Sequence, residues 1–512
     1  MRFYSILYRT PDDEAKRRSA ETVPSYFVDL ALDQIVASVT AGREVYGLEP
    51  DFQLPLSDPD TILYRQQVVR ELQRDGVYNA VTSFADAMVA MRERLKARDD
   101  AHYRYQRDRW FLEAILTYVR AVGKLTEELG ATEPRSRGIG GLLDYLERLT
   151  TSDAFMSLAT GAEHLRSALD AIVYDVLIQG NTVRVRRYAG ETDYSAKVVA
   201  TFEKFERSAS KDYRAKFRAS ATMNHIEAQI LDAVAKLHPD TFTDLHGFCH
   251  ERRDYLDDRV AAFDREAQFY LATLERMRAL ERDSGLRFSL PELAPSWGGT
   301  FAEGLFDAAL AIRVGDEHPV IANDVRLDGD ERLIVVTGPN QGGKTTFARA
   351  FGQLHYLAAL GLPVPASAAR IHPVDGVYTH FEREERVEDL RGKLHEELAR
   401  VHAIVERSTS DSLVIMNEAF SSTTASDALL LSRAVLRQID ARGSLGLVVT
   451  FLDELASLHA RTVSMVGMVD SEDPAVRTFR IVRRPADGRA YAIAIARKYG
   501  LTRDALTERL TA

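Results

Sequence analysis

Residues 337–350 read TGPNQGGKTTFARA and begin at the last residue of the apolar stretch LIVVT (333–337). Four of them, Gly338, Gly343, Lys344 and Thr345, fit the pattern G-x-x-x-x-G-K-[ST]. Glycines at these positions let backbone N–H groups turn toward a phosphate at the positive end of a helix. Lys344 would then reach the terminal phosphates, and Thr345 would place its hydroxyl on Mg²⁺. The strand before the pattern and the helical stretch after it favour a nucleotide-binding P-loop over a glycine-rich turn without a ligand.

A second signal lies in SLVIMNEAFSSTTASDA at 412–428. A P-loop ATPase needs an apolar strand that ends in an acidic pair, because one carboxylate orients Mg²⁺ and the next activates the attacking water. Here the pair is Asn417-Glu418. Glu418 can act as the base, but the neutral Asn417 can ligate Mg²⁺ or its water only weakly. A solvated carboxylate at a strand end is the alternative interpretation of Glu418.

The two halves of the chain differ in their periodicity. From about residue 300 onward, apolar strands such as LVIM at 413–416 and LGLVVT at 445–450 alternate with helical segments, which predicts an α/β domain with a mainly parallel sheet. Residues 1–290 are mostly helical in pattern. From Asp254, apolar residues recur in steps of four and three, which predicts a long helix packed in a bundle, with a coiled coil as the less favoured alternative.

One island interrupts the helical half. Residues 174–188, YDVLIQGNTVRVRRY, alternate with a period of two around Gly180-Asn181. This pattern predicts a β-hairpin that places arginines on one face and valines on the other.

The composition restricts the class of protein. The 512-residue chain carries 66 basic and 76 acidic residues, a net charge of −10, which argues against wholesale coating of nucleic acid or membrane but leaves room for a local basic surface. Its single cysteine, Cys249, excludes an internal disulfide and favours a reducing compartment. Because no apolar run reaches about 18 residues and the N-terminus does not resemble a signal peptide, we expect a cytosolic protein without a membrane span.

The motif GPNQGGKTT resembles the P-loop of the MutS family of DNA mismatch-repair ATPases, which reads GPNMGGKST. Further blocks follow in the family's order: VIANDVRL (320–327), NEAFSSTTASDA (417–428), LVVTFLDEL (447–455) and RPADGRAYAIAIARKYGLTRDAL (484–506). Upstream, DTILYRQQVVREL is similar to the start of the family's core-and-lever region. The resemblance is strong over residues 300–512 and looser before them.

This resemblance implies a multidomain protein, with a mostly α-helical core, lever and clamp region followed by an α/β P-loop ATPase domain of the ABC-like kind. We expect a helical core and the start of the lever at 1–140, a clamp-like lever region with the hairpin and the long helix at 141–290, and a MutS-type ATPase domain at 291–512. Family members dimerise through the ATPase domain and close around DNA under the control of nucleotide. A homodimer that binds duplex DNA, mismatched or branched, is therefore implied.

The resemblance also implies which residues handle ATP and Mg²⁺. Glu418 and Lys344 would be catalytic, and Thr345 and Asn417 would hold Mg²⁺. The nucleotide would be bound by the loop and by one residue against the adenine: Gly338, Pro339, Asn340, Gln341, Gly342, Gly343, Lys344, Thr345, Thr346 and Ile321.

Four positions depart from the family pattern. The metal-ligand Asp is Asn417, the His after the third strand is Phe451, the signature Ser that serves the partner subunit corresponds to Gly392, and the aromatic on the adenine is Val320. Each change weakens one part of ATP handling. We therefore expect slow, DNA-dependent hydrolysis of ATP.

The helical half holds the candidate DNA contacts. Arg184, Arg186 and Arg187 cluster on the hairpin, and Lys211 lies in the basic stretch 202–218. By position this region corresponds to the family's clamp, where basic side chains add salt-dependent, sequence-independent affinity. A solvated face with packed aromatic residues is an equally supported alternative.

The N-terminal part also departs from the family. The lever-like pattern begins near residue 60, which leaves no room for the mismatch-reading domain and the connector, and the chain ends just after the ATPase. Phe111-Leu-Glu113 matches the family's Phe-x-Glu wedge, but its surroundings favour an ordinary helix. We therefore expect branched DNA rather than mismatches as the target.

A third pattern, H-x-x-C-H, is formed by His246, Cys249 and His250. Three potential ligands so close together suggest a metal site, but no second cluster completes a tetrahedral set. A buried cysteine among histidines on a helix surface is the preferred interpretation.

Three functions remain in competition. The leading one is an ATP-dependent DNA-binding protein of the MutS family, associated with the nucleoid, that couples ATP binding and hydrolysis to clamping on DNA in mismatch repair or related repair and recombination. The second is an ATP-gated DNA-binding scaffold with little or no hydrolysis, which Asn417, Phe451 and Gly392 favour and Glu418 opposes. The third is an ABC-type ATPase that does not act on DNA.

Overall fold

The computed structural model describes residues 3–18, 23–53, 56–180, 182–190, 223–382, 393–470 and 476–486. The chain forms two compact units, of which the first contains Met1–Gln73, Arg135–Ile139 and Arg265–Ala512 and the second contains Arg74–Pro134 and Gly140–Asp264. The N-terminal helices therefore belong to the same unit as the α/β region. The division at residues 140 and 290 that the sequence suggests stays a prediction.

Short helices form the N-terminal part of the first unit. They are α1 (Pro11–Arg18), α2 (Tyr26–Asp29), α3 (Leu32–Thr40), η1 (Glu44–Tyr46), α4 (Glu49–Gln53) and α5 (Pro59–Leu72). Helix α5 begins where a capping residue and a proline coincide, since the Asp58 side chain accepts hydrogen bonds from the backbone N–H groups of Asp60 and Thr61.

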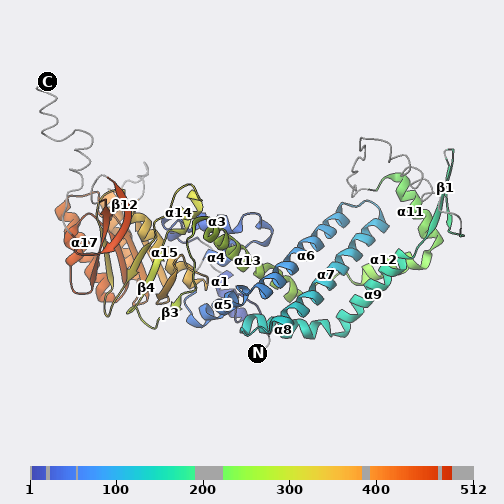
Figure 1. The fold of residues 1–512 in the computed structure, drawn as a ribbon, viewed down its shortest axis with the longest axis horizontal. Helices are drawn as coiled ribbons and strands as arrows, with labels where there is room; N and C mark the ends of the chain where they lie inside the picture. Colours follow the sequence, from blue (N-terminus) through green and yellow to red (C-terminus); the bar gives the residue numbers. More distant parts are fainter. Residues whose placement is uncertain are drawn as a thin grey trace, which may run out of the picture. The chain divides into compact units, whose positions relative to one another are not determined.

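In its described residues, the second unit is helical apart from one hairpin (Figure 1). Its elements are α6 (Asp75–Asp100), α7 (Arg104–Thr132), most of α8 (Arg137–Thr150), α9 (Asp153–Asp170), β1 (Tyr174–Gln179), β2 (Thr182–Arg187), α11 (His225–Leu237) and α12 (Pro239–Glu251). Helices α6 and α7 lie side by side. Helix α13 (Asp258–Ser284) carries the predicted seam, and its residues Val260, Phe263 and Ala267 are buried within the chain. This burial agrees with a bundle helix.

The predicted hairpin is confirmed. Strands β1 and β2 pair antiparallel, with Val176 opposite Val185 and Leu177 opposite Arg184. Gly180 has a φ of 56°, the left-handed backbone that a two-residue turn requires and that glycine adopts without strain. On the valine face, Val185 contacts a core formed by α11 and α12, while Val183 is 41% exposed.

The α/β region contains two sheets. The larger one has the order β12-β11-β6-β10-β9-β8, with parallel pairing except between β11 and β12. Its strands are β6 (Leu333–Thr337), β8 (Gly376–Phe381), β9 (Ser412–Asn417), β10 (Leu445–Val449), β11 (Thr462–Val469) and β12 (Arg477–Arg483). The smaller sheet has the order β3-β7-β4-β5, formed by Glu292–Leu293, Ala368–Ile371, Phe301–Leu305 and Asn323–Arg326. The predicted order of a helical region followed by an α/β region is confirmed.

Helices cover the large sheet on both faces. Every residue of β6, β9 and β10 is buried, as a strand between two helical layers requires. Val414 and Met416 of β9 pack with α16 (Lys393–Arg407) and α17 (Ala425–Arg442). Ile415 points to the other face, where α15 (Lys344–Ala359) lies. Helix α14 (Ala308–Val314) and η2 (Asp453–Ser457) complete this region.

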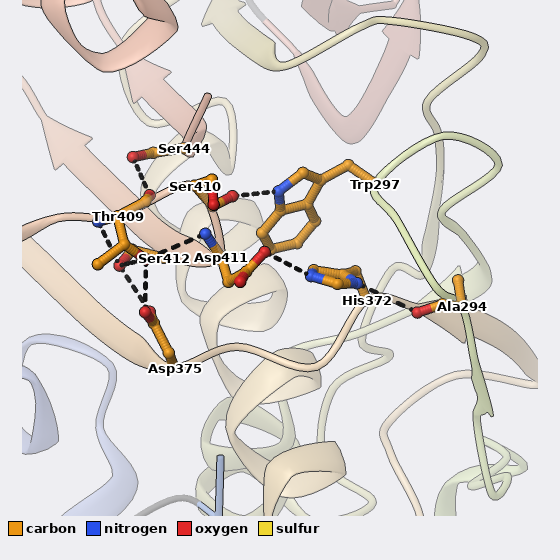
Figure 2. Close-up of polar contacts among 9 residues, drawn as sticks. All are labelled: Ala294, Trp297, His372, Asp375, Thr409, Ser410, Asp411, Ser412 and Ser444. Carbon is orange, nitrogen blue, oxygen red and sulfur yellow. Dashed lines mark hydrogen bonds and ion pairs between the residues drawn. The ribbon is translucent and has the colours of Figure 1, made fainter. Parts of the chain in front are cut away.

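A polar network closes the amino-terminal ends of β8 and β9 (Figure 2). Asp375 accepts hydrogen bonds from Thr409 and, at 2.7 Å, from Ser412 Oγ. Beside them, Trp297 Nε1 donates to the Ser410 carbonyl oxygen at 2.8 Å, and His372 Nε2 lies 2.9 Å from Asp411 Oδ1. The network fixes the turn that precedes β9, at the end of the strands opposite to the P-loop.

Candidate nucleotide site

The P-loop runs from the carboxyl end of β6 to the first turn of α15. Gly338 has a φ of 120°, and a β-carbon there would lie 2.9 Å from the backbone nitrogen of Gly467. Gly343, immediately before the helix, has a φ of 88°. Glycine is therefore needed at both positions, and the loop leaves backbone N–H groups at the amino end of α15 available to a phosphate.

Lys344 is bound to its own loop. Its Nζ donates to the carbonyl oxygens of Gly338 and Pro339, both at 3.0 Å. The ammonium also lies 4.4 Å from the centre of the Phe451 ring, in cation–π geometry. Burial lowers the pKa of Lys344. Phe451, which the sequence resemblance predicts at the family's His position, therefore contacts the P-loop lysine directly.

The residues predicted to hold Mg²⁺ lie together. Thr345 Oγ1 donates to Asn417 Oδ1 at 2.9 Å, which joins the start of α15 to the end of β9. Both side chains offer oxygen, the ligand type that Mg²⁺ prefers, although neither is charged. This donor set fits a Mg²⁺ that keeps most of its waters.

Glu418 follows Asn417 in a turn with unusual backbone geometry. Its φ is 55°, and its backbone N–H donates to the Val449 carbonyl oxygen at 2.9 Å. Burial raises the pKa of the Glu418 carboxyl, which the nearby Lys344 partly offsets. A carboxylate with a raised pKa is a better acceptor for the proton of an attacking water.

Lys344, Thr345 and Glu418 line one cavity of about 420 Å³. It is lined by Gln341–Phe347, by Glu418, and on the other side by His318–Ile321. Ile321 and Val320 thus share a cavity with the loop, and their contact with adenine stays a prediction. Gly338, Pro339 and Asn340, which the sequence resemblance also assigns to the nucleotide, are not among the residues that line it. The Asn340 carbonyl oxygen accepts a hydrogen bond from Arg477 Nε at 3.0 Å.

One residue that lines this cavity, Phe479, follows from no sequence pattern. It lies in β12, is 49% exposed and has a φ of 57°. A β-carbon on Gly343 would lie 3.6 Å from its Cδ1. Asn323 holds this part of β12, because its side chain donates to the Phe479 carbonyl oxygen at 3.3 Å and accepts from the Ile481 N–H at 2.7 Å. An aromatic ring therefore faces the P-loop although Val320 is aliphatic.

The candidate DNA contacts lie on β2 or outside the described residues. Arg186 Nε lies 3.5 Å from Asp175 Oδ2, and Arg187 Nη2 donates to the Leu237 carbonyl oxygen at 2.6 Å. Arg184 lies opposite Leu177. Lys211 and the stretch 202–218 fall outside the described ranges, as does Gly392.

Other sequence candidates have structural roles. Phe111 is buried within α7, as expected for an ordinary helix. Cys249 is buried, which raises its thiol pKa to about 12, and His246 Nδ1 lies 3.0 Å from Asp108 Oδ2. Within the described ranges, no cluster of three His, Cys, Asp or Glu side chains could hold a metal ion. Among the described helices, none combines the length and apolar character needed to cross a membrane.

In this parallel sheet one strand carries a P-loop, and the next strand but one carries an Asn-Glu pair. This arrangement is the core of a P-loop ATPase. Residues 334–509 match the family described as MutS domain V, which is an ABC-like ATPase domain. The C-terminal third of the chain therefore contains a region similar to MutS domain V.

Two curated relatives come from Halobacterium salinarum. Its DNA mismatch repair protein MutS 1 is 33% identical over 196 residues, which are 36% of this chain and 22% of that protein. Its DNA mismatch repair protein MutS 2 is 31% identical over 199 residues, 36% of this chain and 23% of that protein. The chain thus aligns with less than a quarter of the length of either relative.

Proposed function

We propose that this protein binds and slowly hydrolyses ATP, and that the ATP cycle controls its grip on DNA. The observation that carries the proposal is that Lys344, Thr345 and Glu418 line one cavity, while Asn417 accepts a hydrogen bond from Thr345 beside it. The phosphates of ATP would take the place that the Gly338 and Pro339 carbonyl oxygens now have beside Lys344. Thr345 and Asn417 would hold Mg²⁺, which neutralises charge on the phosphates when bound. Glu418 would orient the attacking water and accept its proton.

We place the adenine between the Val320–Ile321 segment and the ring of Phe479, since all three line the cavity. Replacing an aromatic ring that stacks on a base costs about 1–3 kcal/mol. Phe479→Ala should therefore raise the dissociation constant for ATP about fivefold to a hundredfold, measured by equilibrium binding of a fluorescent ATP analogue. Phe479→Tyr keeps the ring and is the matched control. Equal affinities for the alanine and tyrosine variants would contradict the stacking.

DNA binding is the second half of the proposal, and it is supported by the MutS domain and by the arginines of β2. A homodimer formed through the ATPase domain and a nucleoid location are parts of the same proposal. The decisive experiment measures binding and ATPase stimulation with homoduplex, mismatched and four-way DNA, with Lys344→Ala and Glu418→Gln alongside. Stimulated hydrolysis that Lys344→Ala abolishes and Glu418→Gln reduces to a small residual rate supports an ATPase. ATP-dependent binding without single-turnover hydrolysis supports the scaffold, which the neutral Asn417 and the Lys344–Phe451 contact favour.

The clamp assignment has its own test. Arg184→Glu with Lys211→Glu should weaken DNA binding and lower its dependence on salt, because phosphate contacts release counterions. Arg187 stays unchanged in this variant since it donates to the Leu237 carbonyl oxygen. Unchanged affinity at moderate salt would refute the assignment, and no binding to any DNA by the wild type would favour an ATPase that acts elsewhere.

A further inference from the structure

The turn that carries Glu418 contains two residues in left-handed backbone. Glu418 has a φ of 55° and Phe420 a φ of 63°, and neither is glycine. Such geometry is unfavourable for residues with a β-carbon and persists only where the surroundings hold it. On the Phe420 side of the turn, hydrogen bonds to other described residues hold this backbone geometry.

Glu397 of α16 is the centre of these contacts. Its Oε1 accepts from the Phe420 N–H at 2.7 Å, and its Oε2 accepts from Ser422 Oγ at 3.3 Å. The same Oε1 lies 3.0 Å from His380 Nε2 on β8. Glu397 and His380 are both buried, and the Phe420 side chain is fully enclosed beside them. One carboxylate therefore joins β8, α16 and the turn after β9.

The charge on Glu397 is stabilised in place. Burial alone would raise its pKa, but the hydrogen bonds from His380 and from the Phe420 N–H outweigh burial and lower the pKa. His380 Nδ1 is buried and has no hydrogen-bond partner among the described residues. Because a carboxylate only accepts, His380 Nε2 is the donor to Glu397.

We propose that Glu397, oriented by His380, is a positioning residue that fixes the turn after β9 and aims Glu418 at the attacking water. It sets the rate of ATP hydrolysis and leaves the affinity for ATP nearly unchanged, because it contacts the turn and not the P-loop. Since Glu397 belongs to α16, a shift of this helix would move the catalytic carboxylate. This inference rests on the proposed ATPase function.

The test uses the full chain, with single-turnover hydrolysis and equilibrium binding of a fluorescent ATP analogue. Glu397→Ala should slow hydrolysis about tenfold to a hundredfold, the loss typical of a misplaced reacting group, while the ATP dissociation constant changes less than about threefold. In a Glu418→Gln background the same substitution should cause no further loss. His380→Leu should slow hydrolysis, and His380→Gln, which keeps a donor, should restore most of the rate.

Glu396→Gln is the matched control. It changes the neighbouring residue of α16, whose side chain pairs with Arg400 instead of the turn, so its rate should equal that of the wild type. The proposal is wrong if Glu397→Ala weakens ATP binding as much as it slows hydrolysis, if it behaves like Glu396→Gln, or if it slows the Glu418→Gln protein by the same factor. Should Glu397→Ala fail to fold, the comparison of His380→Leu with His380→Gln decides.

The two proposals fail separately. A wild type without Lys344-dependent hydrolysis defeats both the ATPase function and the positioning role. A wild type that hydrolyses ATP at a rate insensitive to Glu397 defeats only the positioning role.

Discussion

Lys344 and Phe451 form a contact that ATP has to replace. The ring lies 4.4 Å from the lysine ammonium, and a cation–π contact at a half-exposed ring contributes about 0.5–1 kcal/mol. Phe451→Leu should therefore tighten ATP binding about two- to fivefold, whereas Phe451→Tyr should leave it unchanged. Calorimetric titration with ATP measures both. Weaker or unchanged binding by the leucine variant would show that the ring does not compete with the phosphates.

Asn417 presents the second test at this scale. Its Oδ1 lies 2.9 Å from Thr345 Oγ1, so Asn417→Asp adds a charge where Mg²⁺ is expected. Because Mg²⁺ prefers carboxylates, the Mg²⁺ concentration that gives half-maximal hydrolysis should fall about tenfold in this variant. In Asn417→Ala this Mg²⁺ concentration should rise. Identical Mg²⁺ dependence of the aspartate variant and the wild type would place the metal elsewhere.

The site residues differ in how far the sequence could reveal them. Lys344, Thr345, Asn417 and Glu418 follow from local patterns, because a P-loop and a strand-end acid are each continuous in sequence. Phe479 and Glu397 follow from no such pattern. Each meets the site through contacts between elements far apart in the chain, and an aromatic on a strand or a glutamate on a helix has ordinary periodicity.

At the scale of elements, the hairpin and the parallel strands were predictable because periodicity and turn residues are local. The docking of the N-terminal helices on the ATPase region was not. Gln353 Nε2 of α15 donates to the Leu30 carbonyl oxygen at 2.9 Å, and Thr379 Oγ1 of β8 donates to Asp29 Oδ2 at 2.6 Å. Hydrophobic periodicity shows which face of a helix is buried, but it does not identify the partner.

Gly352 tests this docking. A β-carbon there would lie 2.5 and 2.7 Å from two methyl carbons of Leu30 and 3.0 Å from Ile415 Cδ1. Overpacking exceeds the gain from replacing a helical glycine, so Gly352→Ala should lower the free energy of unfolding by about 1–2 kcal/mol in chemical denaturation. A β-carbon on Gly123 in α7 would have no atom within 4 Å, so Gly123→Ala should raise the free energy of unfolding by about 0.5–1 kcal/mol. If both substitutions stabilised the protein, the result would contradict the close contact between Gly352 and Leu30.

At the scale of the whole molecule, the N-terminal segment that precedes α1 is part of the core. Leu7 is fully buried, and the Leu7 carbonyl oxygen accepts from Arg65 Nε at 2.9 Å. On the other side, Glu266 of α13 accepts from Ser5 Oγ at 2.7 Å and from the Ile6 N–H at 2.9 Å. An acidic residue thus ties the start of the chain to a helix that begins after residue 257.

This arrangement makes stability depend on pH. Burial raises the pKa of Glu266 from 4.5 to about 7, and the nearby Asp51 and Glu14 add to the effect. Because the folded state holds this proton more tightly than the unfolded state, its contribution is present below pH 4.5 and is lost as the pH rises through about 7. Between pH 5 and pH 8 the wild type should lose about 2–3 kcal/mol relative to Glu266→Gln, which cannot ionise. Denaturant unfolding of both proteins at several pH values measures this difference. A constant difference across that range would mean that Glu266 stays charged beside Ser5 and that the N-terminal contact does not depend on its proton.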